Sequence, residues 1–280
     1  MDRSGLLTVE AVALQSALID IERCVTHGDI RELKSSASSW VLPQLLSEQL
    51  VAISSSLIEF KPHHRLGKFL VLSGVDKSGK ETHCFNQNSL PGVTSVFEHL
   101  RSKGFSVYPV RQPAYDTLLG GLVGAHLGRR AATLKLSGHI ESKYAWLLWS
   151  LDRAQFNPKV DSWLASGPKN VVLAKRWTES HAVYQPEVGV EHERVMKFET
   201  NIVKQDFTIV LDVSPATALR RLKARMDRDD YERASLIERV RGRYLRLSAI
   251  YPFGDVCLVD ASRPLGEVNR DVLALVDELL

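Results

Sequence analysis

The chain has 280 residues, of which 44% are hydrophobic and 25% charged, and its formal net charge at pH 7 is +3. A chain of this length and composition can bury a full hydrophobic core and form one or two domains. The slight positive charge is too small to indicate a nucleic-acid partner, so none is expected.

Nothing in the sequence indicates a membrane or secreted protein. No stretch approaches the roughly 20 consecutive apolar residues of a membrane helix. The N-terminus also lacks the basic region and apolar block of a signal peptide. Cys24, Cys84 and Cys257 lie far apart without a metal-binding spacing, so we expect reduced thiols in a cytoplasmic protein.

Residues 1–66 differ from the rest and are predicted to form an accessory helical segment, used for packing or dimerisation. A second helix is predicted to begin near Pro43, because proline is tolerated in a first helical turn. The polar stretch 27–39 between the two helices is expected to be a loop. The first helix is predicted from apolar residues at spacings of four and three: Leu7, Ala11, Leu14, Leu18, Ile21 and Val25.

Residues 67–280 are predicted to form a second domain of the α/β class. Short apolar, β-branched runs alternate here with amphipathic segments, a pattern typical of a parallel sheet with helices on both faces. In such folds, ligands bind at the carboxyl ends of the strands. The predicted strands are 68–73, 105–110, 170–174, 207–213 and 256–261, and the clearest predicted helices are 139–157, 189–205, 214–226 and 236–250.

The sequence GVDKSGKETH, at 74–83, matches the phosphate-binding pattern GxxxxGK and directly follows the predicted strand 68–73. Glycines in such a loop let backbone amides point at an anion, and the lysine adds a mobile positive charge. The alternative is a glycine-containing turn beside an unrelated lysine. The residues predicted to bind ATP are Gly74, Val75, Asp76, Lys77, Ser78, Gly79, Lys80, Glu81 and Thr82.

One residue of the loop departs from the pattern. Glu81 stands where a serine or threonine hydroxyl normally holds magnesium, and Thr82 follows it. A carboxylate oxygen can itself bind Mg²⁺, so Glu81 is a candidate metal ligand. Pro91 and Gly92 should break the helix after the loop, which is therefore either short, with a restart near Val93, or followed by an insertion.

Later motifs, read together with this loop, resemble the thymidylate kinase family of P-loop nucleoside monophosphate kinases. They are VRQPAYDTLLG (110–120), LLWSLDRAQ (147–155), AKRWTESHAVYQ (174–185) and the arginine-rich stretch 207–247. The resemblance covers the chain from about Lys68 onward and leaves the N-terminal segment outside. It implies a P-loop NTPase fold with a five-stranded parallel sheet.

The resemblance also implies an acceptor site for a nucleoside monophosphate. Asp76 would face the acceptor sugar, and Arg111 would grip the acceptor phosphate. Trp149 would stack on thymine and Arg153 would reach the edge of the base, since residues four apart share one helix face. The segment 174–185 would add Ser180, His181, Tyr184 and Gln185, with Tyr184 crowding the 2′ position and His181 near the pyrimidine.

Four residues are implied to be catalytic. Lys80 would hold the terminal phosphates of ATP, and Lys77 stands where one subgroup often has an arginine. Arg176 would bridge donor and acceptor phosphates. Arg228 matches the arginine of a lid and would meet charge that develops on the transferred group.

Structural roles are the alternative for several of these residues. Trp146 and Trp149 are then core aromatics, and Arg153 is a surface charge. Arg221 and Arg225, which lie near Arg228 in the sequence and could also meet this charge, are then solvated arginines of a helix. The replacement of two family glycines by Ala114 and Tyr115 also leaves the shape of the 110–120 loop open.

A second departure accompanies Glu81. Lys175 stands where the family has an aspartate that helps to organise magnesium. We expect the two changes to be linked, either because Glu81 takes over the metal or because it forms an ion pair with Lys175.

The expected function is phosphorylation of dTMP to dTDP by ATP with Mg²⁺, in a homodimer whose partners are small-molecule nucleotides. One alternative is a kinase of the same fold with another monophosphate acceptor. The other is a catalytically silent nucleotide-binding protein with a regulatory role, because both residues of the metal site are replaced.

Overall fold

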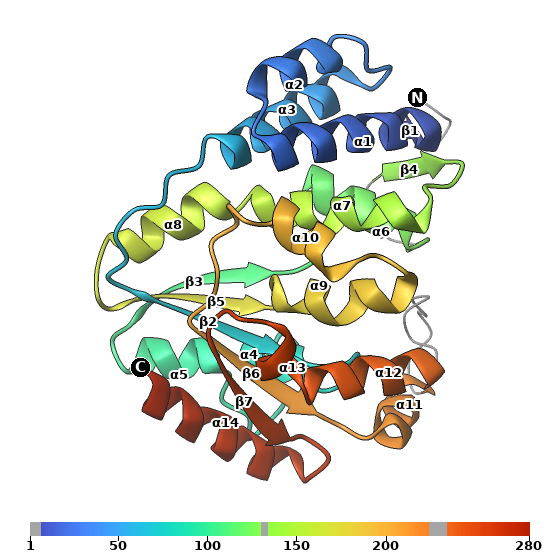
Figure 1. The fold of residues 1–280 in the computed structure, drawn as a ribbon. Coiled ribbons are helices and arrows are strands. Elements are labelled where there is room, and N and C mark those ends of the chain that lie inside the picture. Colours follow the sequence, from blue (N-terminus) through green and yellow to red (C-terminus); the bar gives the residue numbers. More distant parts are fainter. Residues whose placement is uncertain (1–6, 130–133, 224–233) are drawn as a thin grey trace. The chain divides into compact units, whose positions relative to one another are not determined.

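The computed structural model describes residues 7–129, 134–223 and 234–280 (Figure 1). The chain divides into two compact units. The first unit combines the N-terminal residues up to Pro62 with 112–158 and 188–202. The second unit contains 63–111, 159–187 and 203–280. Each unit is therefore built from segments that are distant in the sequence.

The second unit contains a five-stranded sheet in which every neighbouring pair is parallel, in the order β3-β5-β2-β6-β7. All five predicted strands are confirmed, with ends that shift by one residue or less. Their bounds are Lys68–Ser73 (β2), Ser106–Arg111 (β3), Asn170–Lys175 (β5), Phe207–Asp212 (β6) and Asp255–Asp260 (β7).

Helices cover both faces of this sheet, as predicted. Five consecutive residues of β2, from Phe69 to Ser73, are buried, which requires cover on both faces because successive side chains point to opposite sides. Helices α5 (Val96–Ser102) and α14 (Leu265–Leu279) contact each other. A second group of helices in contact with one another consists of α9 (Glu179–Tyr184), α12 (Ala234–Tyr244) and α13 (Leu247–Ile250).

The strand register brings charged residues together at the carboxyl edge of the sheet. Lys175, the last residue of β5, is paired with Leu72 of β2 on one side and with Arg111 of β3 on the other. β2 then leads into the loop at 74–79 and the short helix α4 (Lys80–Cys84). The next helix, α5, begins at Val96, so the prediction of a short helix with a later restart is confirmed.

The first unit consists mainly of helices, with a two-stranded parallel sheet made of β1 (Leu7–Glu10) and β4 (Leu134–Ser137). This small sheet is not among the predicted strands. The helices that lie wholly within this unit are α1 (Ala11–His27), α2 (Ile30–Ala37), α3 (Gln44–Ile58), α6 (Leu118–His126), α7 (Ser142–Ala154) and α10 (His192–Phe198).

Two predictions for the N-terminal segment are wrong. Leu7 lies in a strand, so the first helix begins later, at Ala11. The stretch predicted as a loop contains α2, because Gly28 ends α1 with a φ of 71° and the Asp29 side chain accepts a hydrogen bond from the Glu32 amide at 2.9 Å. α2 buries one residue, Leu33.

The predicted helix starts near Pro43 and Ser214 are confirmed. Pro43 precedes α3, and Ser214 Oγ accepts a hydrogen bond from the Thr217 amide at 3.2 Å ahead of α11 (Pro215–Lys223). Two other predicted helices are longer than those observed, because 139–157 and 189–205 contain the shorter α7 and α10. The predicted helix 236–250 is instead two helices, α12 (Ala234–Tyr244), which begins two residues earlier than predicted, and α13 (Leu247–Ile250). The remaining elements are α8 (Asn157–Ala165) and a 3₁₀ turn, η1 (Gln185–Val188).

All three cysteines are free, as expected. Within the described ranges, the structure has no helix of the length and apolar character required to cross a membrane.

Candidate active site

The loop at 74–79 has the backbone that a phosphate cradle requires. Gly74 has a φ of 133°, and a Cβ atom built there would lie 2.5 Å from the carbonyl oxygen of Leu211. Gly79 caps α4 with a φ of 99°, and Lys77 also has a positive φ of 63°. Such turns direct amide groups into the same space, which is how loops of this kind bind anions.

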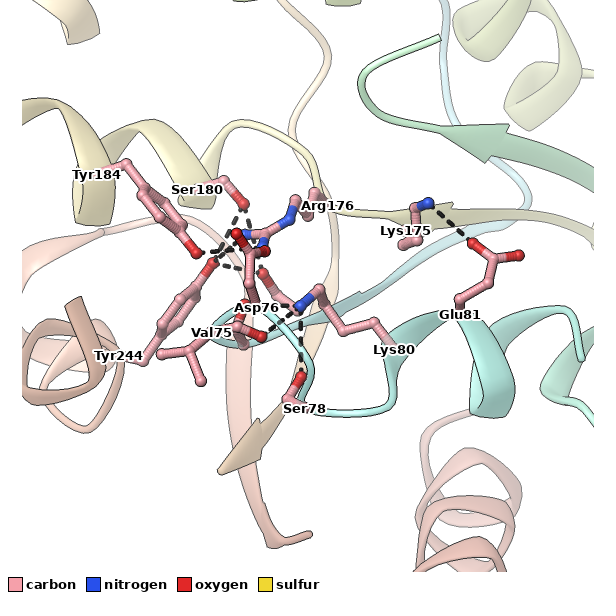
Figure 2. A network of polar contacts seen from close by, with 12 residues as sticks. Val75, Asp76, Ser78, Lys80, Glu81, Lys175, Arg176, Ser180, Tyr184 and Tyr244 are labelled. Carbon is pink, nitrogen blue, oxygen red and sulfur yellow. Dashed lines mark hydrogen bonds and ion pairs between the residues drawn. The ribbon is translucent and has the colours of Figure 1, made fainter. Parts of the chain in front are cut away.

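Lys80 is buried against the loop that precedes it. Its ammonium group donates to the carbonyl oxygens of Gly74, at 3.0 Å, and Val75, at 2.5 Å, and to Ser78 Oγ at 3.3 Å (Figure 2). Burial and the nearby Arg176 guanidinium lower the pKa of Lys80 well below its usual value. An anion bound at the loop would offset both effects and favour the charged form.

Arg176 follows β5 and is fixed from several sides. Its backbone has a φ of 64°, and its amide donates to the Leu72 carbonyl at 3.1 Å. The guanidinium forms an ion pair with Asp76 and donates to the hydroxyls of Tyr184, at 3.1 Å, and Tyr244, at 3.2 Å. Burial alone would raise the pKa of Asp76, but the charges of Arg176, Lys80 and Lys77 outweigh burial and lower it. Asp76 is therefore a carboxylate at neutral pH.

A buried polar network reaches Arg176 through the Tyr244 hydroxyl. Ser73 Oγ donates to Glu179 Oε1 at 2.7 Å and lies 2.9 Å from the Tyr244 hydroxyl. Ser180 Oγ donates to the same Glu179 oxygen at 2.8 Å. Sequence reasoning singled out Ser180 but missed Ser73, Glu179 and Tyr244. The signal available for Tyr244 was its place three residues after Arg241 on α12.

Glu81 and Lys175, the two departures from the family pattern, form an ion pair. Their Oε2 and Nζ atoms are 2.8 Å apart (Figure 2). Of the two alternatives predicted for Glu81, the ion pair is confirmed, and its role as a metal ligand stays a prediction.

Arg111 lies on the other side of Glu81. Its Nε is 3.7 Å from Glu81 Oε1, and its guanidinium carbon lies 3.9 Å from the centre of the Phe85 ring. With its amide oriented to satisfy both neighbours, Gln87 donates to Glu81 Oε1 at 3.1 Å and accepts from Arg111 Nε at 3.2 Å. The carboxylate of Glu81 is thus enclosed by donors.

These residues do not fit a magnesium ion held by the protein. Mg²⁺ prefers oxygen ligands, yet the carboxylate at position 81 is neutralised by an ammonium group, and position 175 supplies that ammonium in place of an oxygen. The ion pair would have to open before Glu81 could bind the metal.

Arg221 ties α11 to the phosphate loop. Its guanidinium donates to the carbonyl oxygens of Lys77, at 3.1 Å, and Ala261, at 3.0 Å. The alternative of a solvated helix arginine is therefore wrong for Arg221. Arg225 and the predicted lid arginine, Arg228, lie outside the described residues.

Trp149 and Arg153, the predicted base-binding residues, lie on α7 in the first unit. Trp149 is half-buried and makes an edge contact with His126, with ring centres 5.7 Å apart. Arg153 is buried, and its Nη1 lies 2.7 Å from Glu199 Oε1. Arg153 is thus not a surface charge, and its role toward a base stays a prediction.

Asp152, which sequence reasoning did not single out, fixes the 112–117 loop in the same unit. Its Oδ2 accepts a hydrogen bond from the Ala114 amide at 3.0 Å, and its Oδ1 accepts one from Gln155 Nε2 at 2.7 Å. Burial raises the pKa of Asp152 to about 7, although the Ala114 amide opposes the shift. The Asp-Arg-x-Gln motif was the available signal.

The other predicted acceptor residues, Ser180, His181, Tyr184 and Gln185, lie on α9 or directly after it in the second unit. Ser180, His181 and Gln185 are buried. Arg176, Lys175 and Lys77 act on Lys80 with their positive charges and Asp76 with a negative one, an excess that suits a ligand with several negative charges.

A parallel α/β sheet with such a loop after its central strand is the arrangement of the P-loop NTPases, the class to which nucleoside monophosphate kinases belong. Residues 72–272 match the thymidylate kinase family, and the chain belongs to that family.

Curated relatives agree with this assignment over most of the chain. A probable thymidylate kinase of Staphylothermus marinus is 32% identical over 76% of this chain and 96% of its own length. A probable thymidylate kinase of Pyrobaculum calidifontis is 29% identical over 76% of this chain and 97% of its own. A thymidylate kinase of Ruthia magnifica is 28% identical over 76% and 98%.

Proposed function

We propose that this chain transfers the γ-phosphoryl group of ATP to dTMP, giving ADP and dTDP. The observation that carries the proposal is the loop at 74–79 with Lys80 behind it, in a chain of the thymidylate kinase family. The matches cover almost the full lengths of the relatives, and the relatives are named as thymidylate kinases, which supports dTMP as the acceptor.

On this proposal, the amides of the loop bind the donor phosphates. The Lys80 ammonium leaves the loop carbonyls and turns to the terminal phosphates, where charge increases during transfer. An oxygen of the acceptor phosphate forms the new bond to the γ-phosphorus. The bond from that phosphorus to the bridging oxygen breaks, and ADP keeps the electron pair.

Arg176 would contact the phosphates as they react. Asp76 and the two tyrosine hydroxyls hold its guanidinium in one orientation, so little motion is lost when the substrates bind. Arg111 would contact the acceptor phosphate. Trp149 and Arg153 would contact its base, with Ser180, His181, Tyr184 and Gln185 around its sugar.

Family membership also supports further expectations. We propose that the enzyme is a cytoplasmic homodimer and that Mg²⁺ accompanies ATP as its cofactor. Sedimentation of the full chain would test the dimer.

The test is a coupled assay for ADP formation in which each nucleoside monophosphate is offered in turn at saturating ATP. We expect dTMP to give the highest kcat/KM. A higher value for another monophosphate would replace the acceptor, and no turnover with any of them would overturn the proposal.

A further inference from the structure

The ion pair between Glu81 and Lys175 joins two elements that adjoin the phosphate loop. Glu81 is the second residue of α4, directly after Lys80, and Lys175 ends the strand next to β2. Both side chains are partly exposed, at 29% and 24%. In Figure 2, the pair lies on the Lys80 side of the loop, away from the Asp76 and Arg176 contacts.

A lone carboxylate at position 81 would oppose the binding of ATP. Like charges that lie close together repel each other more strongly at a protein surface than in bulk water, because the effective dielectric constant is lower there. The Lys175 ammonium cancels this charge at 2.8 Å, and Arg111 lies on the other side at 3.7 Å. Lys175 therefore removes the main cost of placing a glutamate in the loop.

The charge of Lys175 also reaches the loop lysine. Burial is the main reason why the pKa of Lys80 is lowered, and the positive charges of Arg176 and Lys175 add to the effect. The charges of both ammonium groups thus act near the phosphate loop, where Lys80 contacts the loop carbonyls and Lys175 contacts Glu81. Two neighbouring ammonium groups repel each other in the protein without ligand, and a polyphosphate that binds between or beside them removes this repulsion.

We propose that Lys175, oriented by Glu81, contacts the donor phosphates and supplies the positive charge that a protein-held magnesium ion would otherwise supply. This inference rests on the proposed function, because it takes ATP as the donor. Its consequence is that ATP binds to this protein with little dependence on Mg²⁺.

The alternative is an ion pair that only fastens α4 to β5, and single substitutions separate the two roles. K175M removes the proposed contact and leaves the Glu81 carboxylate with Arg111, at 3.7 Å, as its neighbouring positive charge. E81Q removes the carboxylate and keeps the ammonium. A purely structural pair predicts that both variants weaken ATP binding alike.

The experiment is calorimetric titration of the full chain with ATP, in excess Mg²⁺ and in EDTA. Lys169→Met is the matched control, because Lys169 is an exposed lysine at the opposite end of β5. In EDTA, we expect K175M to weaken ATP binding about tenfold and E81Q to tighten it, while the control stays like the parent. Thermal unfolding of each variant identifies any that fail to fold.

A double variant, E81T/K175D, restores the oxygen ligands of the usual pattern. We expect the ratio of the Kd values in EDTA and in Mg²⁺ to be near one in the parent and to rise about tenfold in the double variant. An equal ratio in both proteins would overturn the inference, as would equal losses in E81Q and K175M. ATP binding is measured without an acceptor, so a failed assay with dTMP would leave this result standing.

Discussion

Arg153 and Glu199 form a buried ion pair in the first unit, with Nη1 and Oε1 2.7 Å apart and side chains only 3% and 1% exposed. Ser150 Oγ donates to the same glutamate oxygen at 2.7 Å. The pair joins α7 to the residue that ends α10. Sequence reasoning predicted that Arg153 reaches the edge of a base, which stays a prediction, and the structure shows that Glu199 holds its guanidinium.

Glu199→Ala should lower the free energy of unfolding by about 3–5 kcal/mol, because it leaves a buried guanidinium without its carboxylate. Urea denaturation followed by circular dichroism measures the loss. Lys143→Ala, at the exposed start of α7, removes an ion pair to Glu141 and should change stability little. Equal effects of the two substitutions would contradict the importance of burial.

Lys80→Ala should reduce kcat at least about 100-fold, because it removes a charge that acts on the transferred phosphoryl group. The fold should survive, since the loop carbonyls that accept from Lys80 can bind water instead. The coupled assay and thermal unfolding measure the two effects. Lys159→Ala, at an exposed position of α8, is the control, and full activity in Lys80→Ala would refute the donor site.

Gly74→Ala should destabilise the protein by about 1–3 kcal/mol and weaken ATP binding, because residue 74 has a positive φ that alanine rarely adopts. The added Cβ would also meet the Leu211 carbonyl oxygen at 2.5 Å. Gly266→Ala is the matched control, since a Cβ there meets nothing within 4 Å. Denaturation and ATP titration would show unchanged values if the loop tolerated a side chain.

The buried His83 should make folding sensitive to acid. Burial lowers its pKa from 6.5 to about 4, helped by the nearby charge of Arg221. Below pH 6.5 the unfolded chain binds a proton at His83 that the folded chain does not. The free energy of unfolding therefore falls by about 1.4 kcal/mol per pH unit until about pH 4.

The comparison that tests this effect is between the parent chain and His83→Gln, by denaturation at several pH values. The advantage of the parent over the variant should shrink as the pH falls from 6.5 to 4. Asp152 acts in the opposite sense, because its raised pKa favours the folded state at low pH, but it is common to both proteins. If the free energies of unfolding of the two proteins changed in parallel with pH, His83 would not be a neutral residue in the folded state.

Much of the second unit was predictable because its signals are local. The apolar runs that became β2, β3, β5, β6 and β7 are readable from successive residues, and a parallel sheet follows from the helices between them. The phosphate loop is equally local, since its glycines and lysine are set by short spacings. The resemblance of motifs such as 147–155 and 174–185 then indicated the family, which the match over 72–272 confirms.

The misses fall where a segment depends on a distant partner or on a cap. Leu7–Glu10 forms a strand only because Leu134–Ser137 lies beside it, and no local pattern carries that information. α2 was missed because its eight residues are mostly polar and bury only Leu33.

Local patterns in the sequence are enough to predict the five-stranded α/β fold, the phosphate loop and the presence of Glu81 and Lys175 where the family has other residues. The folded chain is needed to see that these two side chains pair with each other, that Arg153 pairs with Glu199 and that Ser73, Glu179 and Tyr244 support Arg176. Secondary structure follows from periodicity between neighbours, whereas a side-chain contact depends on the register of strands and helices that are far apart in the chain.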